Sequence, residues 1–329
     1  MKRIIPTLTG FLAVHALCAA ELRIGIIGCD TSHVPAFADA FNNPTSKMYV
    51  PGGKVVAAFK GGSVDLPQSI SRVEEYAKTL REKYQVTFYD SIEALCSNVD
   101  VVLLESVDGR KHLEQVKPVL AARKPVFIDK PIAANLADAV EIFRLAREAN
   151  VPVWSSSSLR YGKDTQAVRG GSIGRVTYAE TYSPVEFEEH HTELYWYGIH
   201  GVESLFTALG TGCESVKYSS WTNGVEVTAT WNGGRSGMFR QEKAKVYSQN
   251  FHGIAKGEKG EAKIGSFDGY GPLAVEIMKF FQSGVAPVKP EETIEIAAFM
   301  TAAAESKAQG GAPVKIADVL GKANAAAKK

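Results

Sequence analysis

The sequence predicts an α/β protein, with a doubly wound parallel sheet followed by an α+β domain that has an open antiparallel sheet. Val101–Leu104 and Val126–Ile128 are continuous apolar runs on either side of a helical pattern at His112–Ala122, which is typical of buried parallel strands. Period-two alternation dominates Val216–Phe267, as in an antiparallel sheet. The chain has 329 residues, which is more than one hydrophobic core usually serves.

The first domain is predicted to span residues 21–154, with strands and helices in alternation. Strands are expected at Leu22–Ile27, Val55–Phe59, Val86–Tyr89, Val101–Leu104, Val126–Ile128 and Val151–Trp154. Helices are expected at 33–41, Ile70–Tyr84, Ser91–Cys96, His112–Ala122 and Leu136–Ala149. Ligands of such sheets bind outside the carboxyl ends of the strands. The loops Glu105–Arg110 and Asp129–Pro131 are therefore expected to share one crevice.

The second domain is predicted to span residues 155–329. Four consecutive serines, Ser155–Ser158, follow a strand directly and are interpreted as an ordered crossover between the domains. A strand is expected at Arg175–Ser183, followed by a helix at Gly198–Leu209 and the antiparallel sheet. Two further helices are expected at Ala274–Gln282 and Thr293–Ala308.

Residues 1–20 are predicted to form a secretory signal peptide. Lys2 and Arg3 precede an apolar stretch at Phe11–Leu17, and Cys18-Ala19-Ala20 offers the small residues of a cleavage site. Export to the periplasm or the cell exterior is expected, and the apolar stretch is too short for a stable anchor across ~30 Å of bilayer. Two of the 37 basic residues leave with this segment and the 36 acidic ones stay, so the formal net charge falls from +1 to −1. That balance argues against a broad basic face for nucleic acid.

Several motifs together resemble the glucose-fructose oxidoreductase/inositol dehydrogenase (Gfo/Idh/MocA) family. They are RIGIIGCDTSH at 23–33, SVDGRKH at 106–112, KPVFIDKPIA at 124–133, GSIGRV at 171–176, GIHGVE at 198–203 and PEETIEIAAFMTAAAESKAQGG at 290–311. The resemblance covers nearly the whole chain after residue 20. It implies a Rossmann domain, an NAD or NADP cofactor, a carbohydrate or polyol substrate and a homo-oligomer.

The glycine loop after the first strand departs from the family pattern G-x-G-x-x-G/A. Gly28 occupies the first position, but Asp30 and His33 occupy the second and third. The second glycine normally lets the backbone approach the pyrophosphate, and Asp30 would place a negative charge there. Two interpretations stay open. Asp30, Thr31 and Ser32 cap the following helix, or they belong to the cofactor site, because a capped helix still offers amides to phosphate.

The end of the second strand also differs from the pattern. Lys60 and two glycines stand where an acidic residue would bond the ribose 2′-hydroxyl. A lysine suits a 2′-phosphate better, so NADP is favoured over NAD, and the alternative is a solvated lysine in a turn. The cofactor-binding candidates are Gly28, Asp30, Thr31, Ser32, His33, Lys60, Ser106, Asp129 and Pro131.

The resemblance assigns catalysis to Lys130 and His200. Lys130 matches the lysine of the family's E/D-K-P motif, which contacts the substrate hydroxyl and the nicotinamide; the alternative is an ion pair with Asp129. His200 matches the histidine of the D-x-G-x-H motif and is a natural general base. The motif's aspartate is Trp196 here, and Glu203 is the alternative partner of the histidine.

A carbohydrate site is expected beside these residues. The run Glu188–Glu193 resembles a metal site, but adjacent side chains diverge, so a solvated loop is favoured and no metal site is assigned. Aromatic rings beside polar groups suit sugars. The substrate candidates are Arg160, Tyr161, Trp196, Tyr197 and Glu203.

Two functions follow from the sequence. The first is an exported NAD(P)-dependent oxidoreductase in which Lys130 and His200 handle the proton. The second is a non-redox carbohydrate-binding relative that has lost the cofactor, because free dinucleotide is scarce outside the cytosol and the glycine loop is altered.

Overall fold

The computed structural model describes residues 21–184, 186–192, 194–221, 224–242 and 251–326. The predicted signal peptide therefore lies outside the described residues. Within them, no helix combines the length and the apolar character that a membrane-crossing segment requires.

The first sheet is parallel and doubly wound, as predicted. In the described residues its strands lie in the order β3-β2-β1-β4-β5-β6, and the neighbouring pairs run parallel. The order reverses between β1 and β4, so a crevice is expected at their carboxyl ends. The strands are β1 (Leu22–Ile27), β2 (Gly53–Phe59), β3 (Thr87–Phe88), β4 (Val101–Leu104), β5 (Val126–Asp129) and β6 (Val153–Ser156).

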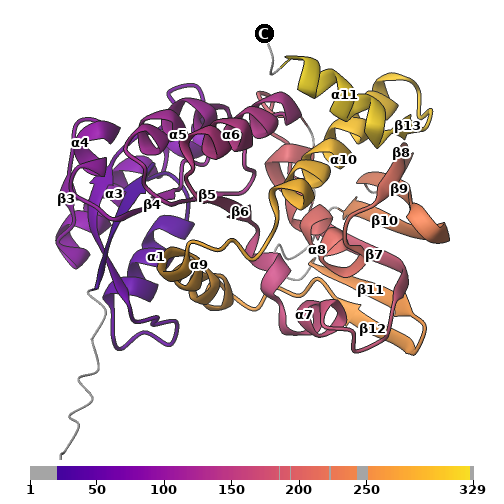
Figure 1. The fold of residues 1–329 in the computed structure, drawn as a ribbon, viewed down its shortest axis with the longest axis horizontal. Helices are drawn as coiled ribbons and strands as arrows, with labels where there is room; N and C mark the ends of the chain where they lie inside the picture. The colour runs from indigo at the N-terminus through magenta and orange to yellow at the C-terminus, as the bar shows by residue number, and fades with distance from the viewer. Residues whose placement is uncertain (1–20, 185, 193, 222–223, 243–250, 327–329) are drawn as a thin grey trace, which may run out of the picture.

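Helices cover both faces of this sheet (Figure 1). One face packs against α4 (Ile92–Cys96), α5 (His112–Ala121) and α6 (Leu136–Ala149) in one hydrophobic cluster. The other packs against α1 (His33–Asn42) and α3 (Val73–Tyr84) in a second cluster. The short helix α2 (Pro67–Ile70) precedes α3.

One helix from the second half of the sequence also packs on the first sheet. This helix, α9 (Gly271–Ser283), lies beside α1 in Figure 1. Leu273, Ile277 and Phe280 are fully buried in the same cluster as α1 and α3. The Phe280 ring meets the Trp154 ring of β6 edge to face, with centroids 5.6 Å apart. The core of the first sheet is therefore completed by a segment far away in the sequence.

The second sheet is open and mixed. Its order in the described residues is β12-β11-β7-β10-β9-β8-β13. It departs from the expected antiparallel pairing where β7 and β10 run parallel, because α8 and a hairpin separate these two strands and no turn sets their direction. The strands are β7 (Val176–Pro184), β8 (Cys213–Trp221), β9 (Gly224–Trp231), β10 (Arg235–Glu242), β11 (His252–Gly257), β12 (Gly260–Ile264) and β13 (Val314–Lys315).

Helix α8 (Ile199–Leu209) packs on one face of this sheet, and every residue of α8 is buried. The helix α10 (Pro290–Ala308) packs on both α8 and β8. Two further helices, α7 (Lys163–Arg169) and α11 (Ile316–Ala326), lie at the edges of the domain. Because α8 is held on all sides, the residues at its first turn have fixed positions.

Candidate active site

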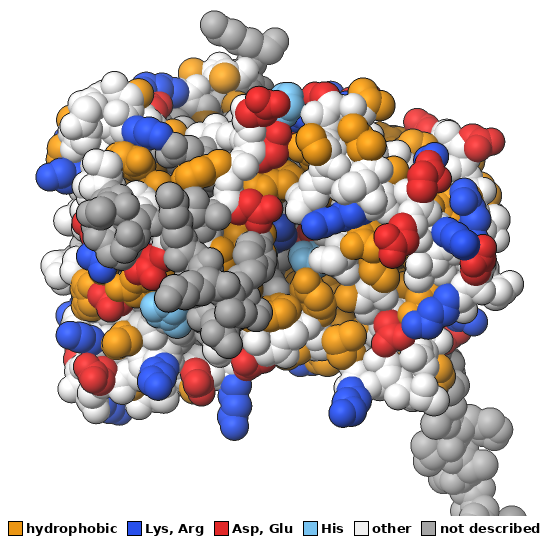
Figure 2. Space-filling view, turned by 180° about the vertical axis from the view of Figure 1, so that it is seen from behind, with side chains coloured by type: hydrophobic (Ala, Val, Ile, Leu, Met, Phe, Trp, Pro, Cys, Tyr) orange, Lys and Arg blue, Asp and Glu red, His pale blue; other side chains and the backbone are white. Residues whose placement is uncertain are grey.

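A cleft of about 440 Å³ lies between the domains, at the carboxyl ends of the first sheet's strands. The N-terminus of α1 and the loops after β2, β4 and β5 form one wall, and the second domain forms the other. Lining side chains include Thr31, Ser32, His33, Gln68, Arg72, Val107, Lys130, Ser158, Leu159, Trp196, Tyr197, His200, Phe251, Phe267 and Tyr270. Basic and acidic side chains are interspersed over the face shown in Figure 2.

Lys130 and His200 reach the cleft from opposite domains. The Lys130 ammonium lies 5.8 Å from the centre of the Tyr197 ring. That ring meets the His200 ring edge to face, with centroids 4.8 Å apart. Tyr197 follows Trp196 in a short π-helical turn, Leu194–Gly198, which leads directly into α8. The structure thus brings together the two predicted catalytic residues and two of the three predicted aromatic residues, Trp196 and Tyr197.

Ser157, not Glu203, orients the His200 ring. The hydroxyl of Ser157 lies 2.7 Å from His200 Nδ1. Burial, with help from the charges of Lys130 and His33, holds the pKa of His200 well below its ordinary range. A neutral imidazole whose Nδ1–H is donated to Ser157 keeps a lone pair on Nε2, so it can accept a proton.

Glu203 and Arg160 form a buried ion cluster behind the cleft. Glu203 accepts hydrogen bonds from Ser156 Oγ (2.8 Å) and from Arg160 Nε (2.5 Å). Arg160 Nη1 also donates to Glu292 of α10 (2.7 Å). Although burial disfavours the cation, these carboxylates hold the pKa of Arg160 above its usual range. Tyr161 borders a separate hollow next to α9, so these three predicted substrate residues do not line the cleft.

Residues 188–191, for which a solvated loop is expected, form an ordered ion cluster. His191 is buried; its Nδ1 lies 2.6 Å from Glu188 Oε2 and its Nε2 lies 3.2 Å from Asp108 Oδ1. Burial alone would raise the pKa of Asp108, but hydrogen bonds from His191, Arg110 and Ser63 hold it far below its ordinary range. The cluster ties the second domain to the loop after β4 beside Trp196, whose ring is 4.9 Å from His191.

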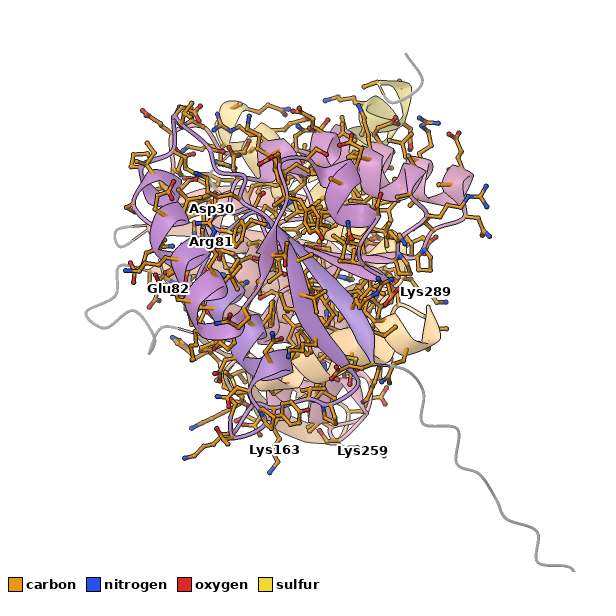
Figure 3. All side chains as sticks on the ribbon, turned by 90° about the vertical axis from the view of Figure 1, so that its left-hand side faces the viewer. Asp30, Arg81, Glu82, Lys163, Lys259 and Lys289 are labelled. Carbon is orange, nitrogen blue, oxygen red and sulfur yellow. The ribbon has the colours of Figure 1, made fainter. Side chains whose placement is uncertain are left out.

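Asp30 joins two loops of the first domain instead of capping α1. Its carboxylate accepts hydrogen bonds from Val107 N (2.9 Å) and Ser69 Oγ (2.6 Å). Burial raises its pKa, against the effect of these bonds. Figure 3 shows Asp30 in the first domain, on the same side as Arg81 of α3. Ser32, the N-cap of α1, makes no side-chain capping bond, but Thr31 engages the first amides of the helix: His33 N donates to Thr31 Oγ1 (3.5 Å) and Val34 N to Thr31 O (3.1 Å). Position 35 is a proline without an amide proton, so this helix end offers few free donors to the cleft.

Gly28 is required by packing. Its φ is +86°, and a Cβ there would lie 2.4–2.6 Å from atoms of Ser106, a contact that no side chain tolerates. Ser106 is correspondingly buried against the glycine and does not belong to the cleft lining.

Besides Lys130, the basic residue that lines the cleft is Arg72, which is not among the predicted site residues. Lys60 instead pairs with Glu74 at the surface, at 2.7 Å. Arg72 and Gln68 line the cleft, just beyond the loop that carries Lys60. Arg72 is the N-cap residue of α3, twelve residues after Lys60, and no motif in the sequence singles it out.

Asp129 and its neighbours lie under the cleft. Asp129 Oδ2 is 2.8 Å from His33 Nδ1, and Glu105 is buried beside them. Burial and the Asp129 charge raise the pKa of Glu105 well above its ordinary value. Burial also acts to raise the pKa of Asp129, but His33 and Lys130 outweigh it and lower that pKa. Pro131 is buried and contributes to a small cavity behind Lys130.

The residues present fit the phosphates of a dinucleotide. The N-terminal end of α1 faces the cleft, and the positive end of a helix dipole attracts anions. Arg72 and Lys130 add two cationic side chains to the cleft lining. The Asp30 charge is engaged by Val107 and Ser69 and does not confront a bound anion.

The fold is that of a Rossmann-type domain followed by a domain with an open mixed sheet. Residues 22–157 match the Gfo/Idh/MocA oxidoreductase family, which has an NAD-binding Rossmann fold. The N-terminal domain of the chain therefore matches this family, which confirms the resemblance seen in the sequence.

Similar proteins support the same fold. The chain is 33% identical over 105 residues to a 1,5-anhydro-D-fructose reductase of Ensifer adhaerens, covering 30% of this chain and 32% of that protein. The match thus spans about a third of that curated relative. The fold resembles scyllo-inositol dehydrogenase from Lactobacillus casei with bound NAD(H) and scyllo-inositol (TM-score 0.71, 13% identity, 91% and 100% coverage). It also resembles myo-inositol 2-dehydrogenase from Lactobacillus plantarum (0.70, 16%, 90% and 99%).

Proposed function

We propose that the protein is an NAD(P)-dependent oxidoreductase that acts on a carbohydrate or polyol. The observation that carries the proposal is the meeting of Lys130 and His200 in one cleft, beside the N-terminus of α1. When bound, the nicotinamide supplies or accepts the hydride. Lys130 holds the reacting oxygen of the substrate, and neutral His200 accepts the hydroxyl proton at Nε2. Trp196 and Tyr197 provide flat apolar surfaces for the C–H faces of a sugar.

Arg72 is the residue we expect to select the dinucleotide. The sequence favours NADP through Lys60, but the Lys60 ammonium is paired with Glu74 outside the cleft, whereas Arg72 lines it. In calorimetric titrations, Arg72→Ala should weaken NADP binding more than NAD binding. Lys60→Ala serves as the matched control and should change the binding of either dinucleotide only slightly. If neither dinucleotide binds at millimolar concentration, an affinity weaker than about −4 kcal/mol, the redox proposal fails.

A second function is favoured by one observation. Buried hydrogen bonds join the loops after β1, β2 and β4. Val107 N and Ser69 Oγ donate to Asp30, and Ser63 Oγ donates to Asp108 (2.6 Å). A crevice fixed in this way suits a non-redox carbohydrate-binding relative. Nucleotide released when the purified protein is denatured distinguishes the two, since that relative would release none and would still bind sugars.

Export and self-association complete the proposal. Residues 1–20 would direct export, and N-terminal sequencing of the secreted protein should then begin near Glu21. The open face of the second sheet would join copies of the chain into a homo-oligomer, which sedimentation velocity would detect.

A further inference from the structure

Three ligand-type side chains converge where β1, β4 and β5 end. They are His33, Glu105 and Asp129, and one ligand atom of each lies within 4.8 Å of the others. His33 is 5% exposed, Asp129 1% and Glu105 0%. We call them the His–Glu–Asp cluster. An imidazole nitrogen with carboxylate oxygens is a donor set typical of divalent transition-metal ions.

Several polar atoms of the cluster have no hydrogen-bond partner. Among the described residues, none serves either oxygen of Glu105 or Oδ1 of Asp129. Nδ1 of His33 lies 2.8 Å from Oδ2 of Asp129, but the two groups are not aligned as a hydrogen bond. Buried polar groups are nearly always satisfied, and an unpaired buried carboxylate is costly. The arrangement is that of donor atoms placed around a shared point.

The neighbouring lysine does not satisfy these atoms. Lys130 directs its ammonium toward Tyr197, 5.8 Å from the ring centre. In the part of the chain that the structure describes, it forms no ion pair with Glu105 or Asp129. A doubly charged ion would balance both carboxylates and accept the imidazole lone pair, whereas an ammonium brings only one positive charge.

We propose that the His–Glu–Asp cluster binds one divalent transition-metal ion, of the Zn²⁺ or Mn²⁺ class. Three protein ligands leave at least one position open. Because His33 also lines the cleft, the ion would sit directly beneath it, within reach of an oxygen of a bound ligand. Ligand distances of roughly 2.0–2.2 Å at a tetrahedral site place the donor atoms roughly 3.3–3.6 Å apart, so the side chains would have to move inward by about 1 Å to complete the site. The proposal goes beyond the redox function and does not depend on it.

The test is metal binding by the full-length purified protein after chelator treatment. Isothermal titration with Zn²⁺ and with Mn²⁺ should show one site per chain. The isosteric substitutions Glu105→Gln and Asp129→Asn should each weaken binding at least 10-fold, since even the loss of an outer-shell partner costs about 10–100-fold. Glu74→Gln, an exposed carboxylate paired with Lys60, is the matched control and should leave affinity unchanged.

Spectroscopy of the wild-type protein tests the site even if the substituted variants do not fold. Pulsed electron paramagnetic resonance of Mn²⁺ in the wild-type protein should show one directly bonded imidazole nitrogen. Absence of any bound ion, absence of that nitrogen coupling, or unchanged affinity in Glu105→Gln would each overturn the proposal. The last result would place the ion elsewhere, for example at His190 and Glu188.

Dinucleotide binding is measured separately on the metal-free protein. Metal binding without dinucleotide binding would defeat the redox proposal and leave the metal site standing. Dinucleotide binding without metal binding would overturn the metal site and leave the redox proposal standing.

Discussion

His200 shows how a single residue obtains its role from its surroundings. The sequence located it through the family motif, but the partner it suggested, Glu203, is paired with Arg160. The actual partner, Ser157, belongs to a run of serines whose four members look alike in the sequence. Only the register of β6 distinguishes them, because the strand continues through Ser156 and leaves Ser157 at its carboxyl end. The His–Glu–Asp cluster could not be predicted from the sequence for a similar reason, since its members lie at the ends of three different strands.

The Ser157→Ala substitution should reduce turnover about 10-fold, while His200→Ala and Lys130→Met should each reduce it ~10²–10⁴-fold. Ser157 acts through His200, so its loss should lower kcat and shift the acid limb of the pH profile without changing KM. Ser157→Thr should restore kcat and the position of the acid limb. The control is Ser155→Ala, on the same strand; steady-state kinetics with equal losses for Ser155→Ala and Ser157→Ala would contradict this role.

Burial of neutral His200 should make stability depend on pH. The pKa of His200 is depressed in the folded protein, so the unfolded chain binds the extra proton as the pH falls through about 6.5. Stability from this group is therefore present above that pH and is lost progressively as the pH falls from 7 to 5. Urea unfolding at both values should show a smaller loss for His200→Gln than for the wild type. Equal losses would mean that the imidazole titrates normally.

At the scale of elements, apolar patterning predicted most of the first domain. The strand expected at Leu22–Ile27 has those bounds, and the helix expected at Leu136–Ala149 has them too. The last strand was misplaced: it was expected at Val151–Trp154 and spans Val153–Ser156, where Ser155 and Ser156 pair with Ile128 and Asp129. Serine is uncommon in buried strands, and neighbouring strands, not local propensity, decided its conformation.

The ion cluster that holds β6, α8 and α10 together should be costly to break. Arg160→Met leaves Glu203 and Glu292 buried without their main partner, which should cost about 3–5 kcal/mol. Arg144→Met is the matched control, because Arg144 pairs with Glu141 and Glu148 on the surface of α6 and such pairs contribute about 0–1 kcal/mol. Urea unfolding measures both; equal effects would show that the buried cluster contributes no more than a surface pair.

At the scale of the whole molecule, the sequence could not predict which core α9 completes. Its amphipathic pattern predicts a helix, but patterning does not say which sheet the helix covers. The structure places Leu273, Ile277 and Phe280 on the first sheet. Each such side chain contributes about 1.5–3 kcal/mol on burial, a sum comparable with the stability of a typical domain.

Residues 21–157 alone should therefore fail to fold cooperatively. We expect this fragment to bind a hydrophobic dye and to lack a sharp thermal transition. A fusion that appends residues 266–289 through a flexible linker should regain both near-ultraviolet circular dichroism and a cooperative transition. Two-state unfolding of the shorter fragment would show that α9 is dispensable.

The route of the chain through α9 also bears on how a ligand enters. The polypeptide passes between the two domains at 156–158, at 264–271 and at 283–290. The middle passage carries Phe267 and Tyr270, which line the cleft, and the Tyr270 ring lies 4.7 Å from the His33 ring. This connection between the domains is thus part of the cleft wall. A rotation of the domains that admitted a ligand would therefore also rearrange the wall that the ligand contacts.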